Sequence, residues 1–162
     1  MNFRQILKRI SLTVLLAIII TGTILTYIVT LVRYAETENF RLDQYRISIA
    51  AMSEVELVHS VHRFNGLESY IVATITHENG EDIYFFIRDG GVQHFFFTAD
   101  LINLETANTI ARQQLPAGQI HRTQLGIINQ TPIFEVQINY DDNVHYVVIN
   151  AETQEIIMQF YT

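Results

Sequence analysis

Residues 10–32 read ISLTVLLAIIITGTILTYIVTLV and contain no charged side chain over 23 positions. At about 1.5 Å rise per residue, a helix of this length covers roughly 34 Å, enough to cross a hydrocarbon core of about 30 Å with some tilt. A helix also satisfies every backbone N–H and C=O group within the segment, as a bilayer requires. The stretch therefore predicts a transmembrane helix, around which the rest of the chain is organised.

The residues that flank this span predict its orientation. Arg4, Lys8 and Arg9 precede it without any acidic residue, whereas the chain that follows is acidic. Because basic flanks stay in the cytoplasm, we expect residues 1–9 to be a cytoplasmic tail and the C-terminal domain to be extracellular. A cleaved signal peptide is the alternative. Its apolar core is typically about 7–15 residues and leads into a small-residue cleavage site, which the LVRY sequence at 31–34 does not supply.

Gly22, Thr26 and Thr30 recur at intervals of four within the span and so share one helix face. Small residues at this spacing let two membrane helices approach closely. The same threonines can instead donate hydrogen bonds to the preceding helical turn. The sequence leaves open whether this face pairs with another membrane helix.

Charge and length limit what the part outside the membrane can do. It has about 129 residues, the size of one domain or two very small ones. All 17 acidic residues but only 6 basic ones follow residue 33, which leaves this part near −11. Binding to nucleic acid or to anionic lipid needs clustered cations, so both are disfavoured. The chain has no cysteine, which excludes disulfides and a lipid-modified cysteine.

The pattern beyond the span predicts two similar units. Residues 33–56 lack Gly and Pro and have helical spacing, so the membrane helix should continue outward as a stalk whose distal half packs on the first sheet. Four β-rich runs follow, bounded by Asn-Gly or Asp-Gly turn signals. A helix at 103–115 and four further runs complete the chain. The predicted strands are residues 57–64, 69–76, 82–88, 92–98, 119–128, 132–140, 144–150 and 155–161.

The two units can be aligned with each other. YIVATI at 70–75 matches FEVQIN at 134–139 with a shift of 64, and IYFFI at 83–87 matches HYVVI at 145–149 with a shift of 62. The predicted fold is therefore α+β, with two units of one helix on a four-stranded antiparallel sheet, at residues 33–98 and 99–162. Because a unit of about 60 residues has a marginal core by itself, we expect the two to bury a shared interface.

No residue pattern predicts catalysis or a bound cofactor. The six histidines form no metal-binding motif, and His59 and His62, three residues apart on a predicted strand, are expected on opposite faces. The acid pairs at 81–82 and 141–142 fall at hairpin tips, where carboxylates are normally solvated. We therefore predict no catalytic, metal-binding or cofactor-binding residues and no small-molecule substrate.

Two aromatic runs on neighbouring strands predict that both faces of the first sheet are covered. The runs YFF at 84–86 and FFF at 95–97 place large apolar side chains on both faces, whereas a sheet with one wet face would alternate. The second face could be covered by the other unit, by the long helix or by a partner protein. If a partner binds there, the residues expected to contact it are Tyr84, Phe86 and Phe96.

Several stretches, together with the order of elements, resemble those of a known family. They are FNG at 64–66 with YIV at 70–72, NG at 79–80 before IYFFI at 83–87, the helix with Ala107 and Ala111, and PIFEV at 132–136 leading to YVVINAET at 146–153. The family that they resemble is the TseB-like cell-wall elongation regulators of Gram-positive bacteria, whose outside portion consists of PepSY-like, cystatin-like domains. One departure is Thr153-Gln154, where PepSY units commonly have Thr-Gly, which weakens a tight turn there.

The resemblance implies a non-enzymatic protein that binds a penicillin-binding protein of the elongation machinery at the outer face of the membrane. It carries over no catalytic residue. PepSY-like units also occur in protease propeptides, so an inhibitor of an extracellular peptidase is the alternative. A weak enzyme or a wall-polymer binder is a third possibility. The sequence does not distinguish activation from inhibition of the partner.

Overall fold

The computed structural model describes the backbone of residues 3–162 and the side chains of residue 14 and residues 16–162. The chain divides into two compact units, Met1–Arg41 and Leu42–Thr162. Helix α1 (Phe3–Ala50) includes all of the first unit that is described and continues into the second. The predicted span at 10–32 lies within α1. Of the predicted tail, residues 1 and 2 lie outside the described residues.

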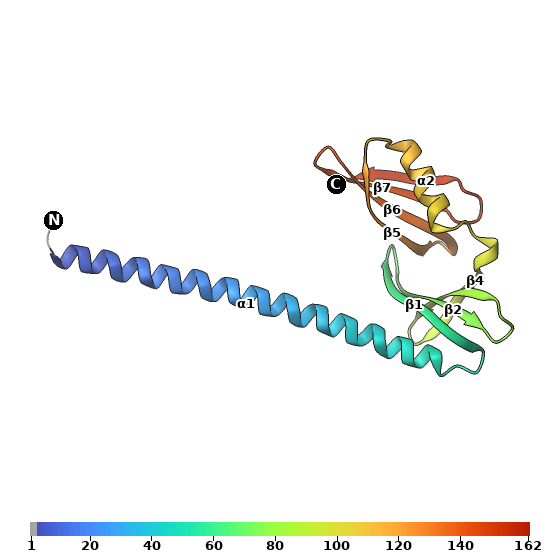
Figure 1. The fold of residues 1–162 in the computed structure, drawn as a ribbon, viewed down its shortest axis with the longest axis horizontal. Helices are drawn as coiled ribbons and strands as arrows, with labels where there is room; N and C mark the ends of the chain where they lie inside the picture. The colour runs from blue at the N-terminus through green and yellow to red at the C-terminus, as the bar shows by residue number, and fades with distance from the viewer. Residues whose placement is uncertain (1–2) are drawn as a thin grey trace. The chain divides into compact units, whose positions relative to one another are not determined.

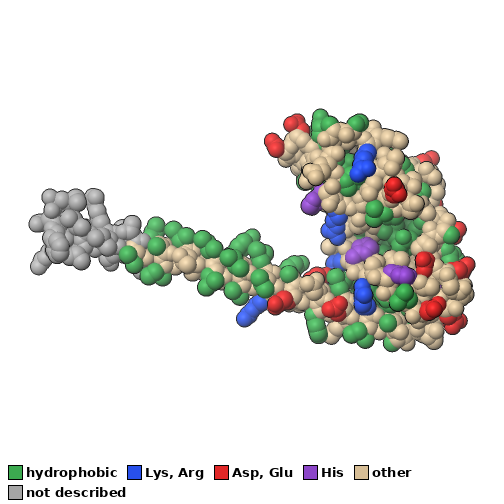
Figure 2. All heavy atoms as spheres, in the orientation of Figure 1, with side chains coloured by type: hydrophobic (Ala, Val, Ile, Leu, Met, Phe, Trp, Pro, Cys, Tyr) green, Lys and Arg blue, Asp and Glu red, His purple; other side chains and the backbone are tan. Residues whose placement is uncertain are grey.

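The apolar side chains of the first unit are exposed. Figure 2 shows them in green along the helix, and among the described residues those from Leu16 to Val32 lie open to the surroundings. Within the part of the chain that the structure describes, one helix is long and apolar enough to cross a membrane. Thr26 Oγ1 donates to Gly22 O and Thr30 Oγ1 to Thr26 O, each at 2.8 Å. The threonines thus donate to the preceding turn, which is the simpler of the two alternatives that the sequence left open.

Helix α1 ends earlier than predicted. It stops at Ala50 rather than Glu56, and the chain turns back so that the N–H of Val55 donates to Met52 O at 3.2 Å. Val55 then pairs with His77 in the first sheet. The prediction was wrong here because local helical spacing continues to Glu56, whereas pairing with a strand distant in the sequence decides the backbone conformation.

The second unit contains two four-stranded antiparallel sheets in meander order, β1-β2-β3-β4 and β5-β6-β7-β8. The 3₁₀ turn η1 (Thr98–Asp100) and helix α2 (Leu104–Gln114) connect them, and Figure 1 shows α2 lying across the second sheet. Asn103 caps α2 by accepting a hydrogen bond from Thr106 N at 2.8 Å. The predicted α+β fold is confirmed. The strands are β1 (Val55–Asn65), β2 (Ser69–His77), β3 (Asp82–Arg88), β4 (Gly91–Phe97), β5 (Gln119–Ile128), β6 (Thr131–Tyr140), β7 (Asn143–Asn150) and β8 (Ile156–Tyr161).

Two-residue hairpins join several of these strands. Arg88 pairs with Gly91 across Asp89 and Gly90, whose φ angles are 53° and 80°. Two consecutive positive φ angles fit a type I′ turn, whose twist matches that of the flanking strands. In the second sheet, the turns with two consecutive positive φ angles contain no glycine. Gln154 also has a positive φ, at 69°, in the turn where the resembling family commonly has glycine.

The two sheets share one core, as predicted from their small size. The larger hydrophobic cluster includes Phe64, Val72 and Phe86 of the first sheet together with Val136 and Ile149 of the second. A smaller cluster lies on the other face of the first sheet, where Ile49 of α1 packs against it. The first sheet is therefore apolar on both faces, and each face packs, in whole or in part, against another element of the chain.

The pairing registers correct the predicted alignment of the two sheets. Ile71 pairs with Ile87 in the first sheet, and Phe134 pairs with Ile149 in the second. If Ile87 is equivalent to Ile149, as the shift of 62 requires, then Ile71 is equivalent to Phe134, a shift of 63 rather than 64. A shift of 64 would exchange the two faces of one strand, because side chains alternate along it. The predicted shift was wrong because the alignment compared residue types alone and did not distinguish the two faces of each strand.

Candidate functional site

The residues predicted to contact a partner lie on the face of the first sheet that belongs to the shared core. Phe86 is fully buried there and has no exposed surface to offer. Its ring meets Phe96 edge to face, with centroids 5.7 Å apart. Tyr84 and Phe96 are partly buried, and burial raises the pKa of Tyr84. Partner contact through Tyr84 and Phe96 stays a prediction, whereas the structural role of Phe86 is that of a core residue.

The opposite face of the first sheet is only partly covered. The end of α1 packs over the sheet through Ile49, which has 1% of its surface exposed, but Phe95 on the edge strand β4 is 58% exposed. Phe95 and Phe97 form an edge-to-face pair with centroids 6.1 Å apart. Together with Ile83 and Phe85, these two rings form the apolar floor of a groove of about 270 Å³. We call this the β4 groove.

Polar residues from two turns form the rim of the β4 groove. They are Glu54, from the turn after α1, and His77, Asn79 and Glu81, from the β2–β3 hairpin. Asn79 Nδ2 donates to Glu81 Oε2 at 2.6 Å, and the N–H of Glu81 donates to Asn79 Oδ1 at 3.0 Å. The N–H of Asn79 donates to His77 Nδ1 at 3.3 Å. These bonds fix the Glu81 carboxylate at the edge of an apolar surface.

A second exposed apolar surface lies on the edge strand β8. Residues 157–161 are all exposed, and the strand contains no charged residue. Phe160 stacks on Tyr146 of the neighbouring strand, with ring centroids 4.6 Å apart and planes 5° apart. In the described part of the chain, one side of β8 has no hydrogen-bonded strand beside it, since it ends the sheet. An edge strand without charge is suited to contact with another protein.

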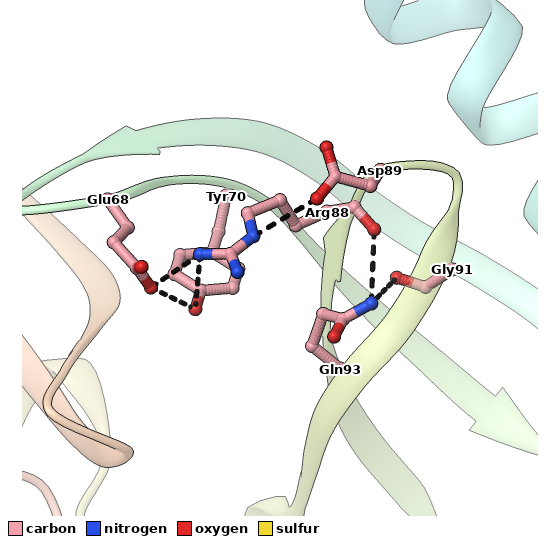
Figure 3. A network of polar contacts seen from close by, with 6 residues as sticks. All are labelled: Glu68, Tyr70, Arg88, Asp89, Gly91 and Gln93. Carbon is pink, nitrogen blue, oxygen red and sulfur yellow. Dashed lines mark hydrogen bonds and ion pairs between the residues drawn. The ribbon is translucent and has the colours of Figure 1, made fainter.

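A polar cavity of about 350 Å³ lies where hairpins of the two sheets meet. Figure 3 shows the network at its wall. Arg88 Nη1 lies 2.6 Å from Glu68 Oε2, Tyr70 OH donates to the same oxygen at 2.7 Å, and the guanidinium carbon lies 5.4 Å from the centre of the Tyr70 ring. Arg88 Nε also lies 3.4 Å from a carboxylate oxygen of Asp89.

The electrostatics of this network show that its charges compensate each other. The hydrogen bond from Arg88, and then that from Tyr70, lowers the pKa of Glu68. The bond to Glu68 in turn raises the pKa of Tyr70. Arg88 thus already has two carboxylate partners, so it is poorly placed to bind an external anion. The network connects the end of β3 to the start of β2, which is a structural role.

The histidines are arranged differently from the prediction. The register of β1 shifts between Val58 and Ser60, which adds a residue to the strand. As a result, His59 Nε2 contacts Thr76 Oγ1 at 2.7 Å, on the face to which His62 also belongs. The expectation of opposite faces was wrong because simple alternation does not hold across a bulge. Among the described residues, no three His, Cys, Asp or Glu side chains are placed to hold a metal ion.

His62 connects the two sheets, and its burial leads us to expect that the stability of the fold depends on pH. Its Nε2 lies 3.1 Å from Leu125 O in β5, and burial lowers its pKa below 6.5. Below pH 6.5 the unfolded chain gains a proton that the folded chain resists, so the free energy of unfolding should fall as the pH decreases through this range. His62→Gln should reduce this decrease, measured as the difference between urea midpoints at pH 7.5 and pH 5. An equally steep decrease in the variant would contradict the assignment to His62.

Comparison with protein families finds a match for the part of the chain that contains the second sheet. Residues 101–159 match the PepSY family, described as peptidase propeptide and YPEB domain. This range contains α2 and most of the second sheet. The C-terminal part of the chain is therefore similar to PepSY domains. No curated protein sequence matches the chain.

A solved structure, that of the YpmB protein, supports the α+β fold. The YpmB protein from Bacillus subtilis covers 78% of this chain and 96% of its own, with a TM-score of 0.61 and 14% identity. A candidate lipoprotein from Clostridium difficile 630 covers 80% of this chain and 92% of its own, with a TM-score of 0.41 and 11% identity. Because so few residues are identical, the similarity to YpmB is a similarity of fold.

Sequence reasoning missed Phe95 and the apolar residues of β8. The FFF run at 95–97 was recognised, but Phe96 was selected from it rather than Phe95. A usable signal was present, since the last strand of a predicted meander is an edge strand. A helix that packs on one face of the sheet covers an edge strand only if it reaches across the whole sheet. Apolar residues on an edge strand are therefore the first to be left exposed.

Proposed function

We propose that this chain, whose second sheet unit is PepSY-like, is a membrane-anchored extracellular module that regulates cell-wall elongation by binding a penicillin-binding protein. The observation that carries the proposal is the exposed apolar surface on two edge strands, with Phe95 on β4 and Phe160 on β8. Exposed aromatic residues of this kind are enriched where proteins bind each other. We propose binding rather than catalysis as the activity.

The helix supports the membrane part of the proposal. Its apolar side chains are exposed from residue 16 to residue 32, which costs free energy in water and none in a bilayer. The basic residues before this segment favour a cytoplasmic N-terminus and an extracellular domain. Anchoring confines the module to the membrane surface and raises its effective concentration for another anchored protein.

The cell-wall part of the proposal is supported by the resemblance to TseB-like regulators in the order of span, stalk and two helix-plus-sheet units. The fold similarity to YpmB is compatible with it, since the match covers 78% of this chain. The acidic balance of residues 34–162 favours a partner protein over an anionic wall polymer.

Inhibition of an extracellular peptidase is the second candidate function. The observation that favours it is the match of residues 101–159 to a family described by its peptidase propeptides. In that case the captured partner would be a peptidase, and adding the protein would reduce the rate of peptide hydrolysis.

Photocrosslinking in living cells tests these alternatives. A photoreactive phenylalanine analogue placed at Tyr84 or Phe96, both partly exposed, or at Phe95 or Phe160, should capture a penicillin-binding protein. The same analogue at Thr153, an exposed residue of the β7–β8 turn that belongs to neither edge strand, is the control. Capture of a peptidase supports the second candidate. Capture of no wall-synthesis enzyme from any of the four positions contradicts the proposal.

A further inference from the structure

The β4 groove combines an uncovered apolar floor with an acidic rim. We propose that it binds a segment of the partner protein that presents aromatic or aliphatic side chains next to arginine or lysine. This inference rests on the proposed function and specifies the surface and the chemistry of its partner. It follows from the comparison of the two sheets and from the charges around the groove.

The second sheet has a polar residue, hydrogen-bonded to its helix, at the place on its edge strand where the first sheet has Phe95. Val147 pairs with Gln159 of β8, as Phe85 pairs with Phe95 of β4, and Phe85 is equivalent to Val147 at the shift of 62. Gln159 Nε2 donates to Gln114 Oε1 of α2 at 3.3 Å, so the helix that lies on the second sheet reaches its edge strand. At the corresponding place in the first sheet, an apolar ring is exposed and no such helix contact is present among the described residues.

The exposed ring favours an apolar occupant. Covering apolar surface is favourable in proportion to the area removed from water. Phe95 is 58% exposed, while Ile83 and Phe85 beneath it are buried, so the groove has a firm apolar floor and one prominent ring. Such an arrangement fits one or two apolar side chains of a peptide packed against Phe95.

The rim favours a cation beside those apolar groups. Glu54 and Glu81 are the charged groups among the groove's lining residues, with His77 as a third titratable group and no arginine or lysine. Because Asn79 holds the Glu81 carboxylate, little conformational entropy would be lost when a guanidinium binds to it. A second copy of this chain is a poorer occupant, since its outer part carries the same strong negative charge.

Selection from a peptide library tests the inference on the full chain in lipid nanodiscs. A phage-displayed library of random dodecapeptides should yield binders that contain aromatic or aliphatic residues together with Arg or Lys. Phe95→Ser should weaken the best peptide at least about tenfold. The double variant Glu54→Gln with Glu81→Gln should weaken it several-fold at low salt and remove most of its salt dependence. Replacing the peptide's basic residues by Glu should abolish binding.

Leu67→Ser provides the matched control, because Leu67 is 79% exposed but lies outside the groove. This variant should bind the peptide as the unaltered chain does. Circular dichroism of each variant shows whether it remains folded. A library that yields no binder, yields uncharged or acidic binders, or yields binders insensitive to Phe95→Ser overturns the inference. Capture of a penicillin-binding protein from Phe160 or Tyr84 in cells would then still support the proposed function.

Discussion

Replacing Gly126 by alanine should lower the free energy of unfolding by about 1–3 kcal/mol, because the core between the two sheets has no room for a methyl group. A Cβ atom at this position would lie 2.3–2.4 Å from three ring atoms of Phe64, which is itself fully buried. The ring would have to move within a packed core. Urea unfolding of the chain in detergent micelles, followed by tyrosine fluorescence, measures the change.

The control for this substitution is Gly91→Ala. A Cβ atom at Gly91 would meet nothing closer than the Gln93 side chain at 3.8 Å, and the backbone φ there is not positive. The change in stability should therefore stay within about 0.5 kcal/mol. Phe64→Leu should be destabilising alone but should recover part of the loss in the Gly126→Ala background. Strict additivity of the two substitutions would show that they do not share this contact.

A substitution at the end of helix α1 should have the second large effect on stability, and a position two residues away provides its control. Ile49 is 1% exposed and packs against the first sheet, so Ile49→Ala should cost about 2–5 kcal/mol through lost burial and the cavity it leaves. Ile47 is 70% exposed, and Ile47→Ala should change stability by less than about 0.5 kcal/mol. The same urea titration distinguishes them.

Equal effects of the two substitutions would contradict the packing of α1 on the first sheet. The contrast also bears on function, because the end of α1 leaves the β4 groove uncovered. If Ile49→Ala loosens the packing of the helix on the sheet, the affinity of the β4 groove for a bound peptide should change together with the free energy of unfolding. Ile47→Ala should leave both quantities unaltered.

Much of the fold could be predicted from local patterns. The strand at 82–88 was predicted with its observed bounds, and the Asp89-Gly90 turn after it was predicted one residue too long, since a tight turn and β-branched or aromatic residues are local signals. The helix at 104–114 was predicted within one residue, because Asn103 is a capping residue and Pro116 follows. The span at 10–32 needed only its length and lack of charge.

The candidate site was predicted less well. Tyr84, Phe86 and Phe96 were selected for size and apolarity, but in the structure they face the shared core, and Phe86 is fully buried. Phe95 is exposed because it lies on the other face of an edge strand. The sequence showed that both faces are apolar, but no local feature tells which face another part of the chain covers.

The sequence by itself determined the apolar span, the two meanders, their turns and the existence of a repeat, because helix and strand periodicities and turn residues act over a few positions. Only the tertiary structure decided that α1 ends at Ala50, that the second strands align with a shift of 63, and that His59 and His62 share a face. Each of these depends on hydrogen bonds or packing between residues distant in the chain. The exposure of Phe95 also depends on the tertiary structure, because the β4 groove exists where the described parts of the chain leave the first sheet uncovered.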